Sequence, residues 1–500
     1  AEIYSDALAG FYEYGPEGAR IKHRIVQLWR RLLVEKEHLL EIDGSIILPE
    51  NVFRASGHLE NFNDPLVVCE SCKTPYRPDK LLEEKFLNIS KNPTKGDMEK
   101  IFPKGANIPE AAPNEYFDGL IEKFEIKCPK CGSKFGKTIR FNMMMKVDVG
   151  ATKTNPAYLR SEACQSIFLD FIRIWKQGRV KLPLGIAQVG KAFRNEIAPR
   201  QWLLRKRELE QMDVEIFFNP EKINEVENWD DVKDYPLNLF LLAEKEISAI
   251  TCQEAVEQNL VSGKIIAYYL ARTQQFGVAL QIPLEKMCFR ELEKEARAFY
   301  SHETWDFEVE VDGAWVELAA CNYRTDYDLK SHAQQSKNDL QVREEGDISK
   351  FTPHIFEISM GVDRTFIAAL DVAFRKEVRG TEERIFLDLP HRIAPYKVGI
   401  YPLMKKDGLS EEAYAIFLVL QRMSVNVCYD ESGSIGKRYA RADEIGIPYG
   451  ITVDYDTLKN QTVTLRERNS MNQKRVPVEA LDEIFWKFST GRKTFEDLAE

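Results

Sequence analysis

Two segments of the chain, residues 184–196 and 207–218, alternate polar and apolar side chains with a period of two. This is the repeat of a β-strand, in which successive side chains point to opposite faces. One face of the first segment carries Gln188, Arg194 and Glu196. The second segment has a polar and an apolar face: Gln211, Asp213 and Glu215 against Met212, Val214, Ile216 and Phe218. The two segments therefore predict neighbouring strands with a polar surface on one side and a hydrophobic core on the other.

The predicted polar surface combines arginines with carboxylates. On a single strand, a solvated antiparallel sheet would give the same alternation. Arginines and carboxylates gathered on two neighbouring strands are less common than polar alternation on a single strand. It suits a polyphosphate ligand, because fixed guanidinium groups bind phosphate bidentately while carboxylates bind an amine or a metal ion.

Length and charge set only broad limits on the protein. A chain of 500 residues is too long for one core, so we expect two to four domains. The formal net charge of -10 does not by itself favour nucleic-acid binding, although a local basic strip can still neutralise phosphates. We find no signal peptide and no apolar stretch of membrane-spanning length. We therefore expect a cytoplasmic protein without a membrane partner.

The nine cysteines fall into two groups. Four of them form two Cys-x-x-Cys pairs, Cys69 with Cys72 and Cys128 with Cys131. The other five are scattered, which favours a reducing compartment over a disulfide framework. Four thiolates predict one closed, structural zinc site. Two unrelated thiol pairs are the alternative.

Three segments resemble the motifs of class II aminoacyl-tRNA synthetases. Phe193-Arg194-Asn195-Glu196, a loop, and Arg207-Glu208 resemble motif 2. Residues 356–364, which end in Gly361-Val362-Asp363-Arg364, resemble motif 3, a strand that runs into a helix carrying an arginine. Pro49, after a long helix and a short strand, resembles motif 1, which forms the dimer interface in that class. Three degenerate motifs in the right order are a far stronger indication than any one of them.

Further segments resemble the glycyl branch of this class, and the resemblance covers nearly the whole chain apart from two inserted segments. The matching stretches are residues 11–18, 55–58, 62–65, 158–165, 185–190, 324–329 and 430–438. The resemblance implies a ligase that activates glycine with ATP and Mg²⁺ and transfers it to tRNA(Gly). It also implies a homodimer.

The resemblance also implies which residues bind ATP. It implies that Arg194 holds the α-phosphate, that Arg205 and Arg364 clamp the outer phosphates, and that Glu317 binds ATP through magnesium. Catalysis would be positioning and electrostatic stabilisation by Arg194, Glu317 and Arg364. The remaining expected ATP-binding residues are Asn195, Glu196, Lys206, Arg207, Leu318 and Gly361.

For glycine itself, the resemblance points to a ring of acidic groups around the ammonium and an arginine near the carboxylate. The expected residues are Glu162, Asp213, Glu357 and Ser359, with Arg324 near the carboxylate and Arg77 as a further position. Four places depart from the family pattern near this pocket: residues 161–166, residues 320–322, Ile358 in place of a proline, and Asp213 in place of a glutamate. Exclusion of alanine is therefore less secure than glycine binding.

Three alternatives stay open on the sequence alone. A non-catalytic nucleic-acid-binding paralogue has no need of the polyphosphate clamp, and a ligase for alanine or serine is kept open by the pocket departures. A zinc-dependent interaction protein would leave the motif 2 and motif 3 matches unexplained.

The expected fold is α+β, an antiparallel catalytic sheet flanked by helices and followed by a C-terminal α/β anticodon-binding domain. We assign residues 1–68, 132–220 and 301–390 to the catalytic domain and 391–500 to the anticodon-binding domain. Residues 69–131 are expected to form the zinc lobe, and 221–300 a helical insertion with possible tRNA contact. Candidate acceptor-end contacts are Lys85, Lys91, Lys95, Lys100, Lys104, Arg200 and Gln201.

Overall fold

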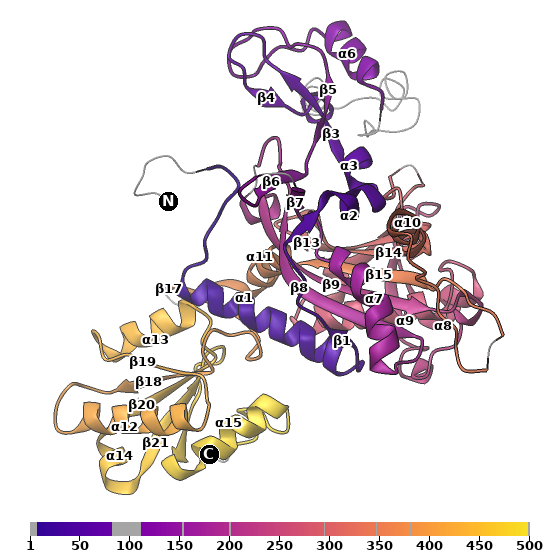
Figure 1. Cartoon of the computed structure of the whole chain (residues 1–500). Coiled ribbons are helices and arrows are strands. Elements are labelled where there is room, and N and C mark those ends of the chain that lie inside the picture. The colour runs from indigo at the N-terminus through magenta and orange to yellow at the C-terminus, as the bar shows by residue number, and fades with distance from the viewer. Residues whose placement is uncertain are drawn as a thin grey trace.

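The computed structural model describes residues 8–82, 112–152, 155–199, 202–294, 296–346, 348–379 and 382–498. The seven candidate acceptor-end residues therefore lie outside the described part of the chain. Nine strands form the largest sheet (Figure 1), here in spatial order: β1 (Leu40–Glu41), β8 (Leu184–Phe193), β9 (Glu208–Phe218), β15 (His354–Gly361), β14 (Ala314–Thr325), β13 (Glu303–Val311), β12 (Met287–Glu291), β10 (Pro236–Phe240) and β11 (Ile247–Thr251). The pairs β1–β8 and β10–β12 are parallel, and the other neighbours are antiparallel.

Helices pack on both faces of this sheet. One face is covered by α1 (Pro16–Trp29), η2 (Arg30–Glu35), α9 (Lys264–Ala279) and α11 (Val362–Ala373), and the other carries α7 (Gln165–Gly178) and α10 (Tyr327–Ser336). Met212, Val214 and Ile216 of β9 are buried against the first group. Phe217 points the other way and stacks on Phe171 of α7, with ring centroids 4.2 Å apart. The period-two alternation predicted for residues 207–218 is therefore what divides the core from the polar surface.

Residues 221–300 differ from the expected helical insertion, because they add strands to the catalytic sheet. β10, β11 and β12 extend it beyond β13. Within this range, residues 247–257 form β11 and the short α8 (Cys252–Glu257), which begins with a capping box at Thr251. Only α9 is a long helix, and its side chains are buried on nearly all sides. The charged residues between strands had masked the short apolar runs of β10 and β12. Four 3₁₀ turns complete this half of the chain: η3 (Trp202–Leu204), η4 (Pro220–Lys222), η5 (Trp229–Asp231) and η6 (Leu284–Lys286).

Two smaller sheets lie beyond the edge of the catalytic sheet. The first contains β2 (Ile47–Pro49), β7 (Asn155–Leu159) and β6 (Met145–Val149), next to α2 (Glu50–Ala55) and α3 (His58–Asn61). The second contains β4 (Pro75–Tyr76), β3 (Asn63–Val68) and β5 (Ile139–Asn142), with α6 (Asn114–Lys123) packed on it. Figure 1 shows this second group as a separate lobe that projects from the catalytic core.

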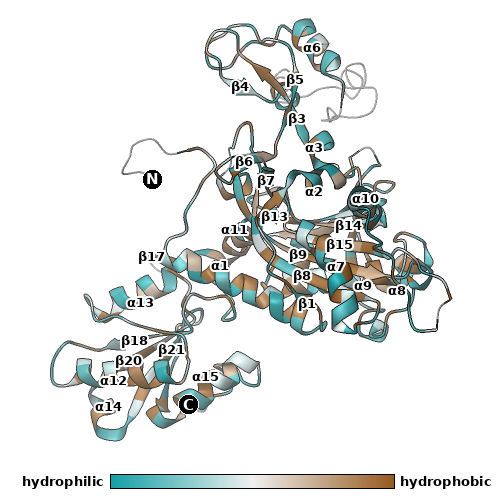
Figure 2. Ribbon diagram, viewed as in Figure 1, coloured by the Kyte–Doolittle hydropathy of each residue, from teal (hydrophilic) through white to brown (hydrophobic). Residues whose placement is uncertain are grey.

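The C-terminal part is a separate α/β unit with its own core. Its sheet has the order β19 (Val427–Tyr429), β18 (Val398–Pro402), β20 (Tyr449–Val453), β21 (Thr462–Glu467) and β22 (Gln473–Pro477). Its helices are α12 (Leu409–Arg422), α13 (Ile435–Glu444), α14 (Tyr455–Asn460), η7 (Val478–Ala480) and α15 (Leu481–Thr490). Figure 2 shows apolar residues along the sheet strands and a mostly polar α13.

A hairpin, β16 (Phe374–Arg379) and β17 (Glu382–Leu387), links the two units. Arg384 of this hairpin donates to Asp443 Oδ2 of α13 at 2.9 Å, and Arg468 Nη2 lies 2.8 Å from Asp388 Oδ1. These pairs attach the C-terminal unit to the end of the catalytic core. Within the described residues, no helix is long and apolar enough to cross a membrane.

Candidate active site

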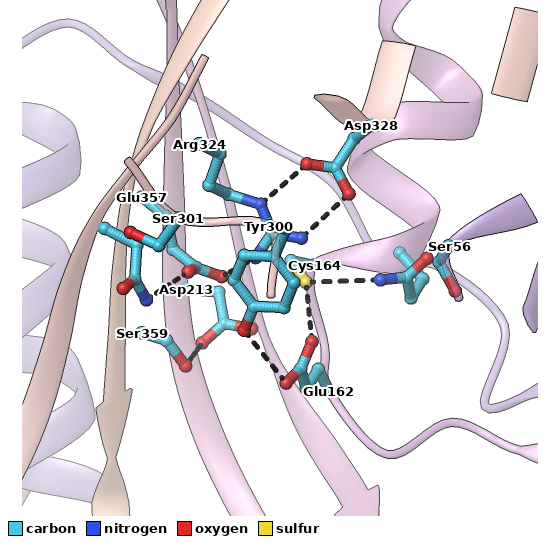
Figure 3. A network of polar contacts seen from close by, with 12 residues as sticks. Ser56, Glu162, Cys164, Asp213, Tyr300, Ser301, Arg324, Asp328, Glu357 and Ser359 are labelled. Carbon is cyan, nitrogen blue, oxygen red and sulfur yellow. Dashed lines mark hydrogen bonds and ion pairs between the residues drawn. The ribbon is translucent and has the colours of Figure 1, made fainter. Parts of the chain in front are cut away.

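The polar face of the catalytic sheet carries a network of buried carboxylates (Figure 3), which we call the acidic pocket. Asp213 of β9 lies opposite Ser359 of β15 in the antiparallel register, and Ser359 Oγ donates to Asp213 Oδ1 at 2.8 Å. Glu357, two residues before Ser359, faces the same side. Glu162 enters from the loop that precedes α7. Four residues expected to bind glycine are therefore brought together, although they come from three distant parts of the chain.

Arg324 is the buried counterion of this pocket. Its guanidinium is fully buried and binds Asp328 bidentately, with Nε–Oδ2 and Nη2–Oδ1 distances of 2.7 and 2.8 Å. Nη1 donates to Glu357 Oε1 at 3.0 Å. Because two carboxylates already neutralise Arg324, its contacts fit the positioning of Glu357 better than direct binding of the glycine carboxylate.

The acids of the pocket are held in different protonation states. Burial, together with the negative charge of Glu357, raises the pKa of Asp213 to about 8. Burial also raises the pKa of Glu357 above its usual range. Glu162 behaves oppositely: burial would raise its pKa, but His58, Arg324 and Arg194 outweigh that effect and lower it. Glu162 is therefore ionised at neutral pH. Asp213, with a pKa of about 8, is mostly protonated there.

Glu215 adds a neutral acid beneath the pocket. It is fully buried, and neither of its carboxyl oxygens has a hydrogen-bond partner among the described residues. Burial and the nearby charge of Glu357 raise its pKa well above the ordinary value. A protonated carboxyl group avoids the large cost of an isolated buried charge.

Two aromatic residues that sequence reasoning missed close the pocket. The Arg324 guanidinium lies 3.6 Å from the centre of the Tyr300 ring, and the Tyr300 hydroxyl is 3.5 Å from Glu162 Oε1. His58 Nε2 lies 3.1 Å from Glu162 Oε2, and Ser56 holds the other ring nitrogen at 2.8 Å. His58 lies in the matching stretch 55–58, although that match gave it no role, whereas no local pattern points to Tyr300.

The departures from the family pattern are also placed here. Asn322 donates to Glu357 Oε2 at 2.7 Å, so it takes part in holding that carboxylate. The Cys164 thiol lies 3.7 Å from Glu162 Oε2, and burial raises its pKa well above the ordinary value. A neutral thiol at this position narrows the pocket without adding charge.

The residues expected to bind phosphates lie next to this pocket. Arg194 Nη2 is 3.9 Å from Glu162 Oε1, and its guanidinium rests 5.3 Å from the centre of the Phe62 ring. Arg364 Nη1 lies 3.1 Å from Glu317 Oε2 and also donates to the Glu317 carbonyl at 2.8 Å. All three charged groups are partly exposed, at 29, 36 and 42% for Arg194, Arg364 and Glu317. They are therefore accessible to a bound polyphosphate.

Motif 2 continues this phosphate side. Arg205 Nε pairs with Glu196 Oε2 at 2.7 Å, which orients both side chains within the loop between β8 and β9. Arg207 instead donates to the backbone carbonyls of Glu196 and Ala9. Its contacts therefore fix the N-terminal segment and the turn in place.

Lys206 is buried, unlike the arginines on either side of it. Its ammonium lies 2.7 Å from Asp363 Oδ1, and both side chains are almost fully enclosed. Asp363 also accepts from the Tyr14 hydroxyl at 2.5 Å and from the Glu210 amide at 3.2 Å. This pairing places Lys206 in a link between motif 2 and the start of α11, where it serves as a structural residue.

Three other expected ATP-binding residues could contact ATP mainly through their backbone atoms. The Asn195 amide donates to the Met143 carbonyl, Leu318 is buried in the core, and Gly361 directly precedes α11.

Arg77 lies at the root of the projecting lobe, where it pairs with Asp64 at 2.7 Å and Asp79 at 2.6 Å. Asp64 in turn lies 3.7 Å from Arg205 Nη2, so the contacts of Arg77 lead to the phosphate side.

A cluster of acids on the β13–β14 hairpin fits a hard cation. Glu308 lies opposite Glu317 in the strand register, and Asp306 is nearby. Burial, then the charges of Glu317 and Glu308, raise the pKa of Asp306 to about 8. Carboxylate oxygens are ligands that Mg²⁺ takes alongside substrate phosphates, and here Glu308 pairs with Arg290 and Glu317 with Arg364.

The four paired cysteines converge in the projecting lobe. Sγ–Sγ distances are 3.5 Å between Cys69 and Cys131 and 3.6 Å between Cys72 and Cys128, and all four sulfurs lie within 4.8 Å of one another. A tetrahedron with Zn–S bonds of about 2.3 Å has sulfurs about 3.8 Å apart. Hydrogen bonds at Thr74 lower the pKa of Cys72 to about 6, which favours a thiolate. The donor set and its spacing fit zinc.

The sheet, the paired arginines and the acidic pocket are those of a class II aminoacyl-tRNA synthetase. The family model for the tRNA synthetase class II core domain (G, H, P, S and T) matches residues 146–373, and the anticodon binding domain model matches residues 397–487. Among curated proteins, the glycine–tRNA ligase of Methanothrix thermoacetophila is 34% identical over 99% of this chain and 95% of that protein. That of Pyrococcus abyssi is 36% identical over 96% of this chain and 93% of that protein. The chain belongs to the glycine–tRNA ligase family, and the expected α+β fold with a C-terminal anticodon-binding domain is confirmed.

Proposed function

We propose that this protein joins glycine to tRNA(Gly) in two steps, through glycyl-adenylate. The observation that carries the proposal is the position of Glu162. This carboxylate belongs to the acidic pocket, yet it lies 3.9 Å from Arg194, the arginine of the phosphate side. An amino acid whose ammonium is held by Glu162, Asp213 and Glu357 would direct its carboxylate toward the α-phosphate held by Arg194.

The first step is attack of the glycine carboxylate oxygen on the α-phosphorus of ATP, with pyrophosphate as the leaving group. Arg194 stabilises the charge that develops on the α-phosphate, and Arg364 and Arg205 hold the outer phosphates. Class II synthetases use ATP with Mg²⁺, which neutralises phosphate charge when bound, and Glu317 with Glu308 and Asp306 would hold it. The chain provides positioning and fixed charge, so no protein nucleophile is required.

The pocket selects glycine by charge and by enclosure. Carboxylates bind the ammonium, while the Tyr300 ring and the Cys164 thiol occupy the space around Glu162. A β-carbon on the substrate would have to displace one of these groups. Tyr300→Ala should therefore raise kcat/KM for alanine relative to glycine, because one missing contact discriminates a methyl group by about 1–3 kcal/mol.

The test is ATP–pyrophosphate exchange with each of the twenty amino acids, followed by aminoacylation of a tRNA(Gly) transcript. Exchange with glycine alone, lost in Arg194→Ala, is the expected result. Exchange with alanine or serine in place of glycine would refute the specificity, and no exchange from the folded protein would favour a non-catalytic nucleic-acid-binding role. Arg54→Ala is a matched control, since among the described residues this exposed arginine forms an ion pair only with Glu50 of its own helix.

We also propose a homodimer and one structural Zn²⁺ per chain. Exposed apolar side chains gather at the motif 1 segment, where Leu40, Ile46 and Ile47 are 38, 38 and 46% exposed. Burial of such a group against a second copy would remove it from water. Sedimentation equilibrium and metal analysis of the purified protein test the two proposals separately.

A further inference from the structure

The carboxylate of Glu162 is held differently at its two oxygens (Figure 3). Oε2 lies 3.1 Å from His58 Nε2, an ordinary hydrogen-bond distance, and the Cys164 thiol is a weaker second contact at 3.7 Å. The contacts of Oε1 among the described residues are longer: the Tyr300 hydroxyl at 3.5 Å and Arg194 Nη2 at 3.9 Å. Oε1 therefore keeps the capacity to accept from a further donor, whereas Oε2 is anchored by His58.

His58 is itself oriented by a second polar contact. Ser56 Oγ lies 2.8 Å from Nδ1, and the two residues are only 0 and 1% exposed. Because the ionised carboxylate of Glu162 can only accept, Nε2 must be the donor in its bond to Oε2. Ser56 can serve Nδ1 either as donor or as acceptor, so this second bond holds for both the neutral and the charged ring. Rotation of the imidazole away from Glu162 would break a hydrogen bond at each nitrogen.

Three aromatic rings pack around His58. The centroids of Phe62, Phe299 and Phe53 lie 5.6, 6.2 and 6.3 Å from the centroid of the imidazole. Gly57, the preceding residue, has φ 79°, and an added Cβ there would lie 3.0 Å from the Phe299 ring. The turn that brings His58 among these rings therefore requires glycine.

The segment that carries His58 is also attached to the phosphate side of the site. The Phe62 carbonyl, at the end of α3, accepts from the Met143 amide at 3.1 Å. The Met143 carbonyl in turn accepts from the Asn195 amide of motif 2 at 2.8 Å. The Phe62 ring lies 5.3 Å from the Arg194 guanidinium. One short segment thus contacts both the carboxylate expected to bind the ammonium and the arginine expected to bind the α-phosphate.

We propose that His58 is a positioning residue for glycine: it anchors Oε2 of Glu162 and so directs Oε1 toward the substrate ammonium. The inference rests on the proposed function and deepens it. A carboxylate that is already held in its binding orientation loses less conformational freedom when the ligand arrives, so glycine binds more tightly. The effect of His58 should fall on glycine rather than on ATP, because its hydrogen bond is made to Glu162.

The test compares two replacements of His58. His58→Gln keeps a donor, because the side-chain amide nitrogen can take the place of Nε2, whereas His58→Leu keeps apolar packing and removes the donor. Ser56→Ala removes only the bond to Nδ1. His391→Leu is the control, since this histidine lies between β17 and β18 and its buried Nε2 has no hydrogen-bond partner among the described residues. Pyrophosphate exchange gives kcat and the KM for glycine and for ATP, and thermal unfolding checks each fold.

His58→Leu should raise the KM for glycine on the order of 10-fold, because a hydrogen bond to a charged group is lost, and should change the KM for ATP less than about twofold. His58→Gln should stay within about threefold of the unmodified protein, because a donor remains. Ser56→Ala should raise the KM for glycine about threefold, because only the bond that orients the ring is lost. The control should match the unmodified protein.

The same KM for glycine in the Gln and Leu variants would overturn the proposal and assign His58 to packing. An equal rise in the KM for ATP would also overturn it, because the effect would then extend to the whole site. If His58→Leu does not fold, an unchanged KM for glycine in Ser56→Ala would overturn it instead. Absence of glycine-dependent exchange in the unmodified protein would refute the proposed function.

Discussion

Glycine should bind more tightly as the pH rises from 7 to 8, because Asp213 must give up a proton to hold the ammonium. Burial and Glu357 raise the pKa of this carboxyl to about 8 in the empty pocket. Its Oδ2 atom has no hydrogen-bond partner within the described residues, so it is available to the substrate. A cationic ligand favours the ionised form, and glycine binding should therefore release a proton.

The size of the effect follows from the fraction of protein that is ready to bind. With a pKa of about 8, roughly a tenth of the empty protein has Asp213 ionised at pH 7 and about half at pH 8. The apparent dissociation constant scales inversely with that fraction, so the KM for glycine should fall about fivefold over this interval. Glu162 contributes little to the change, because neighbouring cations lower its pKa and keep it ionised throughout.

The assay is pyrophosphate exchange at saturating ATP, with the KM for glycine measured at half-unit steps from pH 6.5 to 8. Asp213→Asn is the matched variant: it keeps the shape but cannot titrate. Its KM for glycine should be roughly 10- to 100-fold higher than that of the unmodified protein, because one charge-assisted hydrogen bond is lost. This KM should not depend on pH in this range. A KM that stays flat in the unmodified protein, or that keeps its pH dependence in Asp213→Asn, would refute the reasoning.

Three further outcomes follow from contacts described above. Lys206→Met should lower the free energy of unfolding by about 3 kcal/mol, measured by urea denaturation, because it leaves Asp363 buried with only neutral donors; a loss below 1 kcal/mol would contradict a buried pair. Arg324→Lys should abolish exchange at ordinary glycine concentrations, because one ammonium cannot make the bidentate contact with Asp328 and also hold Glu357; near-normal activity would exclude a positioning role. Cys72→Ser should remove the bound metal, as measured by metal analysis, and should raise the KM for ATP more than the KM for glycine. An unchanged metal content would exclude Cys72 as a ligand.

The sequence was most informative where the alternation along one strand predicted which side chains face the core and which face the polar surface. The alternation over residues 207–218 placed Asp213 on the polar face and Val214 in the core, and the structure shows both. The resemblance to motifs 2 and 3 also assigns Arg194 and Arg364 to the phosphate side of one site, and this assignment stays a prediction. These features are local or periodic, so a linear pattern can carry them.

What the sequence did not reveal depends on partners far along the chain. Arg205, Lys206 and Arg207 are three consecutive cations, and only the position of Asp363, 157 residues away, decides that the middle one is buried. Tyr300 likewise reaches the pocket from a segment with no recognisable motif. The charged stretch after residue 221 hid three short strands. β12 joins the sheet through β13, which lies beyond residue 302, and β10 and β11 join it only through β12. Tertiary contacts override local propensity at each of these places.

The carboxylate of Asp64 serves two parts of the molecule at once. It pairs with Arg77 at the root of the cysteine lobe and lies 3.7 Å from Arg205 on the phosphate side. Thermodynamic linkage requires that any influence through a shared group be mutual. If metal binding in the lobe changes the affinity for ATP by some factor, ATP binding must change the affinity for the metal by the same factor. If the proposed metal tightens ATP binding, a cell rich in ATP retains that metal more firmly than a starved one. Measuring either affinity with the other ligand present gives the size of the coupling.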